Sequence, residues 1–287
     1  MCMKSIERTG YIQLVLFSVI VGTVGVFVKL VEGLDVFSIV FLRAAIAAIF
    51  IFLVMLFMKG IKEIRIVSPV KTLLVGVFQG LSIALYFMAI LQTSVTNAVF
   101  LLYTAPVFSV ILAKYFLKEK IEKETVIGVL ITIIGIILIL QPGTFTFMSE
   151  EVIGNLLGLG AGFFYAAMAL TAKPIMDKKS GYYITFWQYL IISLMFVWFF
   201  KIDSVSVVFD NLWQLLMIGV FCTGIAFILF MEGVQKVKAQ KIFIITALEP
   251  LAGTVLALIL LAEIPSVLTV AGSALIIYGV YRTTRQC

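Results

Sequence analysis

Long runs of apolar residues alternate along this chain with short polar connections. Ten runs are nearly free of charge and long enough to cross a bilayer, which takes about 20 apolar residues per helix. They cover residues 10–29, 37–58, 70–91, 96–115, 125–141, 152–172, 182–200, 212–232, 240–261 and 265–281. The runs are apolar on all sides, which is typical of membrane helices and not of the alternating strands of a barrel. The pattern predicts an all-α membrane protein with ten transmembrane helices.

Composition supports this prediction and narrows the chemistry. Of 287 residues, 63% are hydrophobic and 13% are charged, against about 45–50% and 25% in soluble domains. The spans leave no room for an appended soluble domain, which excludes a hydrolase or nucleic-acid module. Because histidine is absent, HExxH zinc sites and Ser-His-Asp triads are excluded. Cys2, Cys222 and Cys287 have no CxxC spacing, and we expect neither a metal nor a cofactor.

Basic residues are distributed unequally between alternate connections. Eighteen of the 21 Lys and Arg lie in one set, and only Lys29 and Lys201 lie in the other. Positive residues are retained on the cytoplasmic side of a membrane, so both termini are predicted to be cytoplasmic. The net charge of +6 then describes orientation, and no nucleic-acid partner is expected.

The chain also matches itself at an offset of 144 residues. The matching pairs are Gly10 and Gly154, Pro106 and Pro250, Glu119 and Glu263, Gly128 and Gly272, and Gly135 and Gly279. This predicts two five-helix repeats, residues 1–142 and 152–287. Five is odd, so the second repeat enters the membrane with opposite orientation, as in many secondary transporters.

One motif of the repeat points to a known family. It runs from Ala105-Pro106 through Leu117-Lys118-Glu119 to Gly128 and Gly135, and recurs from Glu249-Pro250 to Gly279. With the ten-helix pattern, it resembles the EamA-like family of the drug/metabolite transporter superfamily over essentially the whole chain. Arg43 matches a basic position often found in that family. The resemblance implies a multi-pass carrier of a bacterial or archaeal inner membrane, with a basket-like fold around a central cavity, typically an exporter of amino acids or other small metabolites. The superfamily also carries sugar phosphates, nucleotide sugars and drugs, so the cargo stays open.

Most of the motif has a structural interpretation. Pro106 and Pro250 each remove a backbone donor inside the membrane and should bend their helices, as packing kinks and as hinges or cavity walls. Glu119 and Glu263 precede the next helix and should cap its N-terminus. In the run 154–162, glycines at every fourth position should allow close helix packing.

Intramembrane charges are more informative, because they are costly and usually functional. Glu249 lies about 12 Å into its predicted helix, with Thr246 and Gly253 on the same face. Its carboxylate could accept a substrate ammonium or a coupling proton, or it could be a buried group bonded to a neighbouring helix.

Two other charged residues, Arg43 and Glu232, lie within or at the end of predicted spans. Arg43 could extend to the outer headgroups, or face inward as a gate or anion contact. Glu232 is expected at the interface, paired with Lys236.

Uncharged polar residues complete the predicted cavity. Gln79, Ser82 and Tyr86 share one helix face by their spacing, and Thr223, Ala226 and Phe230 stand at the equivalent positions of the second half. Further candidates are Tyr103, Thr104, Tyr165, Trp187 and Gln188. Aromatic faces, amides and one acid suit a small amphipathic molecule such as an amino acid or a cationic drug.

These observations predict a secondary carrier that works by alternating access. The chain has no Walker A motif, so direct ATP hydrolysis is not expected. An intramembrane enzyme and a scaffold without transport are the alternatives. Direction, coupling ion and oligomeric state do not follow from the sequence.

Overall fold

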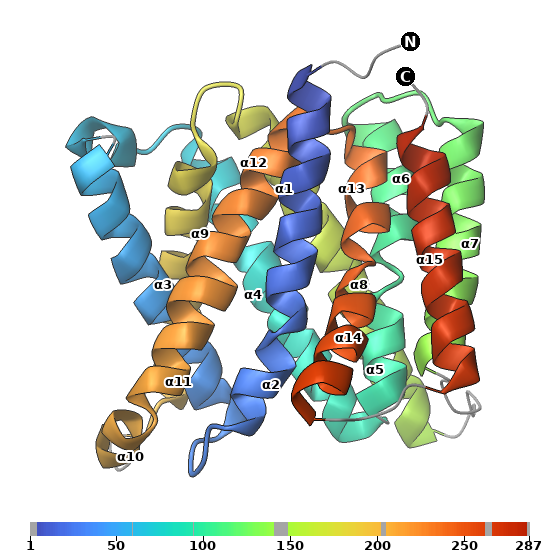
Figure 1. The fold of residues 1–287 in the computed structure, drawn as a ribbon. Helices are drawn as coiled ribbons and strands as arrows, with labels where there is room; N and C mark the ends of the chain where they lie inside the picture. Colours follow the sequence, from blue (N-terminus) through green and yellow to red (C-terminus); the bar gives the residue numbers. More distant parts are fainter. Residues whose placement is uncertain are drawn as a thin grey trace.

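A computed structural model describes residues 5–58, 60–93, 95–140, 149–201, 205–261 and 266–285. All regular structure in these ranges is helical (Figure 1). The first repeat contains α1 (Ser5–Gly22), α2 (Val24–Lys29), α3 (Val36–Met58), α4 (Pro69–Gln92), α5 (Val95–Leu102), α6 (Ala105–Phe116) and α7 (Lys123–Leu140). The second contains α8 (Ser149–Ala172), α9 (Gly181–Phe196), α10 (Val205–Asp210), α11 (Leu212–Leu216), α12 (Ala226–Lys236), α13 (Ala239–Thr246), α14 (Glu249–Leu261) and α15 (Val267–Thr284).

Eight stretches of the described chain are helical, long and apolar enough to cross a membrane. The other two predicted spans, 10–29 and 240–261, are each built from two shorter helices, α1 with α2 and α13 with α14. The protein is therefore a multi-pass helical membrane protein, while the count of ten spans remains a prediction. The π-helical segment Met217–Ile225 joins α11 to α12.

The sequence predicted that Pro106 and Pro250 bend continuous helices. The structure has a break between two helices at each of them instead. The chain breaks between α5 and α6 and between α13 and α14, and Pro106 and Pro250 lie in the first turn of the second helix of each pair. The preceding helices end at Leu102 and Thr246, each four residues before its proline. A proline ring clashes with the carbonyl four residues earlier, whereas its missing N–H costs nothing in a first turn. The prolines therefore end one helix and start the next.

Glycines allow the closest helix contacts in the bundle. A Cβ at Gly135 of α7 would lie 2.7 Å from the carbonyl oxygen of Gly272 in α15, and one at Gly279 would lie 3.0 Å from that of Gly128. Gly158 of α8 packs in the same way on Leu101 of α5, as its spacing predicted. These contacts join one helix of the first repeat to one of the second.

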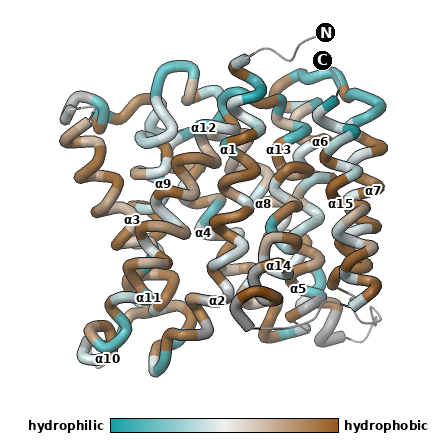
Figure 2. The backbone as a smooth tube through the Cα atoms, viewed as in Figure 1, coloured by the Kyte–Doolittle hydropathy of each residue, from teal (hydrophilic) through white to brown (hydrophobic). Residues whose placement is uncertain are grey.

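Helix α1 begins and α15 ends at the same end of the bundle (Figure 1), here called the terminal end. Hydrophilic residues gather there, and apolar residues cover the helices between the two ends (Figure 2). The predicted pair of Glu232 and Lys236 is confirmed at 3.1 Å. Glu232 Oε1 also accepts a hydrogen bond of 2.9 Å from Gly181 N, at the start of α9.

The prediction that Glu119 caps the helix that follows it is wrong. Its carboxylate does not cap the next helix, α7, but accepts a hydrogen bond of 3.0 Å from Ala239 N and one of 3.3 Å from Gln240 Nε2, at the start of α13. The connection between α6 and α7 lies beside the N-terminus of a helix of the other repeat, where backbone donors are free. Glu263, the equivalent residue, lies outside the described residues.

A second carboxylate strengthens this junction. Glu122 pairs with Lys238 and, at 3.3 Å, with Lys241. Burial raises the pKa of Glu122, but the hydrogen bond from Lys238 and the charge of Lys241 outweigh it and hold that pKa below its ordinary value. The same hydrogen bond raises the pKa of Lys238. The terminal end of the bundle is therefore tied together across the two repeats by ion pairs and a helix cap.

Candidate functional site

A cavity of about 430 Å³ lies inside the bundle. Its wall is formed by α1 to α5 and α8, by the π-helical segment, and by α12 and α14, so both repeats contribute. It extends from the break before α14 toward the end away from the termini. Eight of the residues predicted for the site line it: Arg43, Gln79, Ser82, Tyr86, Tyr103, Tyr165, Glu249 and Pro250.

Glu249 is the first residue of α14 and stands at the helix break. Its Oε2 accepts a hydrogen bond of 3.2 Å from the hydroxyl of Tyr103, which lies at the equivalent break between α5 and α6. Its Oε1 is buried and has no hydrogen-bond partner among the described residues. The free helix N-terminus favours a negative charge at this place. One carboxylate oxygen is thus held by Tyr103, and the other has no partner among the described residues.

The side chain of Gln79 contributes a second free acceptor to the same wall. Its Oε1 is buried and is also without a hydrogen-bond partner in the described part of the chain. Gln79 shares its face of α4 with Ser82, whose hydroxyl donates to Ala161 O at 2.9 Å and so fixes α4 against α8. Buried amides without partners are uncommon in native structures and call for an explanation.

Arg43 of α3 lines the cavity, together with Tyr165 of α8 and Cys222 of the π-helical segment. No carboxylate of the described residues lies within 4.0 Å of its guanidinium. The cavity therefore contains an acid and a base that do not neutralise each other by direct contact.

Aromatic side chains fill the bundle between the cavity and the terminal end. The ring of Tyr165 meets that of Phe243 edge-on at 4.8 Å, and Phe17 lies 4.8 Å from Phe230 and 5.1 Å from Phe227. Four of these five rings, all except that of Tyr165, are at most 5% exposed. They separate the cavity from the ion-paired end.

Five predicted candidates lie outside the cavity lining: Pro106, Trp187, Gln188, Thr246 and Thr104, whose hydroxyl donates to Leu101 O. Trp187 donates to Ile64 O at 3.2 Å, in the connection between α3 and α4, and so holds that connection to α9. Thr246 is buried at the end of α13, with its hydroxyl 3.4 Å from Phe243 O, and Pro106 is buried at the start of α6. Gln188 is fully buried in α9. A helical repeat places residues on a face but does not say which face meets the cavity.

The π-helical segment is a part of the site that sequence reasoning missed. Cys222 of this segment lines the cavity and lies 3.2 Å from the hydroxyl of Thr23, at the break between α1 and α2. Gly219 allows α3 to approach, because a Cβ there would lie 2.6 Å from Ile46. Such wide turns are frequent at functional sites. The only signal in the sequence is a pair of glycines, Gly219 and Gly224, five residues apart.

Among the described residues, no group of three or more Cys, Asp or Glu side chains is placed to hold a metal ion. The cavity instead offers one cationic group, two free oxygen acceptors and three tyrosine side chains.

A bundle of membrane-crossing helices around a central cavity with a mainly apolar wall and a few polar groups is consistent with a membrane transporter. Comparison with known proteins identifies the group to which the chain belongs. The sequence model of the EamA-like transporter family matches residues 8–141 and 152–285, and the chain is a member of that family.

Individual relatives agree with this assignment. An uncharacterized transporter of Archaeoglobus fulgidus is 31% identical, with 97% of each chain covered. The uncharacterized transporter YetK of Bacillus subtilis is 32% identical over 96% of this chain and 87% of its own. Solute carrier family 35 member G1 of Mus musculus is 26% identical over 93% of this chain and 76% of its own. One crystal structure, 19% identical, matches with a TM-score of 0.82 over 99% of this chain and 97% of that chain, which shows the same fold.

Proposed function

We propose that this transporter is a secondary carrier of a small zwitterionic metabolite, an α-amino acid or a close relative, and that it exports this substrate across the cytoplasmic membrane. The observation that carries the proposal is the arrangement of Arg43, Gln79 and Glu249 in one cavity. The guanidinium suits a carboxylate, because it offers two parallel donors. The free oxygens of Glu249 and Gln79 suit an ammonium, which has three donors to place.

The remaining wall suits the side chain of such a substrate. Tyr86, Tyr103 and Tyr165 add aromatic faces to a lining that is otherwise mainly apolar. Ligand sites typically combine an apolar surface with a few polar groups that fix orientation. An apolar or aromatic amino acid fits a cavity of about 430 Å³.

Transport would proceed by alternating access of two inverted repeats, residues 1–142 and 152–287, in a ten-helix bundle with both termini in the cytoplasm. In this arrangement the cavity lies on the outer half, and the aromatic cluster and ion pairs close the cytoplasmic half. Opening inward would require α13 to part from Glu119 and Glu122. The breaks before α6 and α14 are the places where half-helices can move separately.

A binding experiment tests the substrate class. Thermal unfolding of the purified carrier is measured with phenylalanine, with phenethylamine and with 3-phenylpropionate, which share a ring and differ in charged groups. A ligand that binds the folded state raises its stability, by about 2.7 kcal/mol at 100 times its Kd. We expect phenylalanine to stabilise most, Arg43→Gln to abolish its advantage over the amine, and Glu249→Gln to abolish its advantage over the acid.

One alternative has an observation in its favour. Glu249 surrounded by tyrosine rings also suits a cationic drug without a carboxylate. In that case the amine would stabilise as well as the amino acid, and Arg43→Gln would leave both unchanged. Labelled-substrate counterflow in proteoliposomes then separates a carrier from an enzyme or a scaffold, because only a carrier exchanges its substrate unaltered.

Glu249 would also carry a coupling proton. Its depth in the bundle and its hydrogen bond to Tyr103 support this role. Glu249→Gln should remove the pH dependence of uptake into proteoliposomes. Full activity with an unchanged pH profile in that variant would refute proton coupling at this residue, while leaving the substrate class to the binding experiment.

A further inference from the structure

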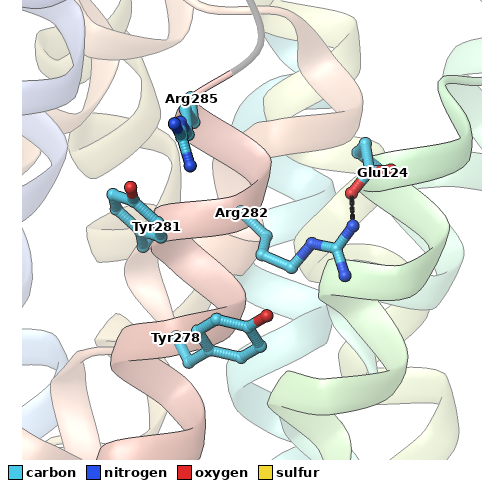
Figure 3. A pocket seen from close by; sticks show the side chains of 5 residues that line it. All are labelled: Glu124, Tyr278, Tyr281, Arg282 and Arg285. Carbon is cyan, nitrogen blue, oxygen red and sulfur yellow. Dashed lines mark hydrogen bonds and ion pairs between the residues drawn. The ribbon is translucent and has the colours of Figure 1, made fainter.

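A second hollow of about 590 Å³ lies at the surface, where α7 begins and α15 ends, remote from the central cavity. Its wall consists of Glu124 from α7 and Tyr278, Tyr281, Arg282 and Arg285 from the end of α15 (Figure 3). Figure 3 shows Arg282 directed toward Glu124 of α7, with Tyr278, Tyr281 and Arg285 along the end of α15. The central cavity uses none of these residues.

Of the two arginines in this hollow, only Arg282 has an ion-pair partner among the described residues. Arg282 donates to Glu124 in a contact that joins α15 to α7 (Figure 3). Arg285 lies over the ring of Tyr281, 5.7 Å from its centroid, and within the described residues no carboxylate comes within 4.0 Å of its guanidinium. Two arginines and one glutamate leave one net positive charge, with guanidinium donors that suit a phosphate.

The position of the hollow favours a phosphate that belongs to a membrane lipid. Its residues stand at the terminal end of two membrane-crossing helices, 123–140 and 267–284. Tyr278 and Tyr281 are 48% and 51% exposed, at the level where tyrosines contact lipid headgroups. Basic pockets between helices at this level bind anionic headgroups. A free anion would leave most of the two exposed rings uncovered, whereas a lipid can cover them with its glycerol and chains.

From these contacts we infer that the hollow between α7 and α15 binds the headgroup of an anionic phospholipid. Arg285 is the principal phosphate contact, Arg282 the secondary one, and the two tyrosine rings support the glycerol region. Glu124 holds Arg282 in place. The site is independent of the transported substrate.

Native mass spectrometry of the full-length protein in detergent tests this inference. The protein is titrated with phosphatidylglycerol and, separately, with phosphatidylcholine. We expect a preference for phosphatidylglycerol that falls as salt rises, and a loss of about five-fold in Arg285→Gln, the effect of one basic group at a lipid surface. Lys114→Gln is the matched control, because Lys114 also lies at the end of its helix, α6, over a tyrosine, 5.6 Å from the ring of Tyr115.

Three outcomes would overturn the inference. Equal binding of both lipids by the wild type would mean that the hollow does not distinguish an anionic headgroup from a zwitterionic one. Equal losses in Arg285→Gln and Lys114→Gln would assign the preference to the general basic surface. Displacement of phosphatidylglycerol by millimolar inorganic phosphate would identify the occupant as a free anion. The first and third outcomes need no variant, so the test does not depend on whether Arg285→Gln folds.

Discussion

The two helix breaks of the bundle have the same backbone and different chemistry. Each break ends a helix four residues before a proline and begins the next within one residue of it. The residue before the proline is Ala105 in the first repeat and Glu249 in the second. Ala105 is buried, whereas Glu249 lines the cavity. The comparison teaches that the repeat supplies the geometry and that a single unrepeated side chain supplies the charge.

The breaks also meet. Tyr103 of the first break donates to Glu249 of the second at 3.2 Å, and neither residue has a polar counterpart at the other break, where Ala247 and Ala105 stand. An acid from one repeat is therefore oriented by a hydroxyl from the other. Substitutions that make the two breaks alike test whether Glu249 distinguishes them, and substitutions at one break test its separate role.

The largest effect is expected from Glu249→Ala, which gives the second break the Ala-Pro sequence of the first. Loss of a charge-assisted contact of about 1.5–3 kcal/mol corresponds to a decrease of roughly 10- to 100-fold in counterflow. Thermal stability should not fall, because a buried carboxyl is removed. Ala105→Ser, which adds a polar atom to the first break, is the control and should transport normally. Counterflow within three-fold of wild type in Glu249→Ala would contradict the assignment.

The second largest effect is expected from substitution of the prolines. Pro250→Ala removes the clash with the carbonyl of Thr246 and allows α13 to run into α14, which would rotate Glu249 away from the cavity. We expect about a ten-fold loss of counterflow, against about two-fold for Pro106→Ala, with stability changed by less than about 1 kcal/mol in both. A larger effect of Pro106→Ala would reverse the assigned roles of the two breaks.

A smaller effect is expected from Tyr103→Phe, which removes the hydrogen bond between the breaks and keeps the ring. A net hydrogen-bond contribution of about 1 kcal/mol predicts a decrease of about five-fold in substrate affinity, measured by thermal shift or counterflow. Tyr86→Phe is the matched control on the same cavity wall. Equal losses in both variants would show that ring polarity matters rather than the contact with Glu249.

The smallest effect concerns stability at the terminal end. Because the pKa of Glu122 is lowered in the folded protein, its contribution is fully present above its ordinary value of 4.5 and is lost as pH falls through the folded pKa. The pKa of Lys238 is raised, so its contribution holds below 10.5 and is lost only at higher pH. Glu122→Gln should lower thermal stability slightly at pH 7, by at most about 1 kcal/mol for a partly exposed pair. The difference should shrink as pH falls through the folded pKa of Glu122, which lies below 4.5. The exposed Glu32→Gln is the control and should leave thermal stability unchanged at pH 7.

Much of this architecture follows from the sequence. The eight membrane-crossing helices and the Glu232–Lys236 pair all lie where residue patterns placed them, because hydropathy and helical spacing are local properties. Eight residues predicted for the site line one cavity, and seven of them are polar, since polar groups inside a membrane bundle have few other places to lie.

The rest depends on contacts between distant segments. Glu119 caps α13 rather than α7 because the fold brings the start of α13 beside it, which no spacing within one helix reveals. Trp187 and Thr246 lie away from the cavity because each helix packs on several neighbours, and only the assembled bundle decides which face meets the open space. The π-helical turn at Cys222 likewise depends on the close approach of α3 at Gly219.

The spacing of four residues from Leu102 to Pro106 and from Thr246 to Pro250 has one further consequence. Each break is specified by a proline acting on its own chain, so it needs no help from the opposite repeat. The two breaks can therefore change independently, although their backbones match. A single codon, at position 249, is enough to give one of them a carboxylate and leave the other without a charge.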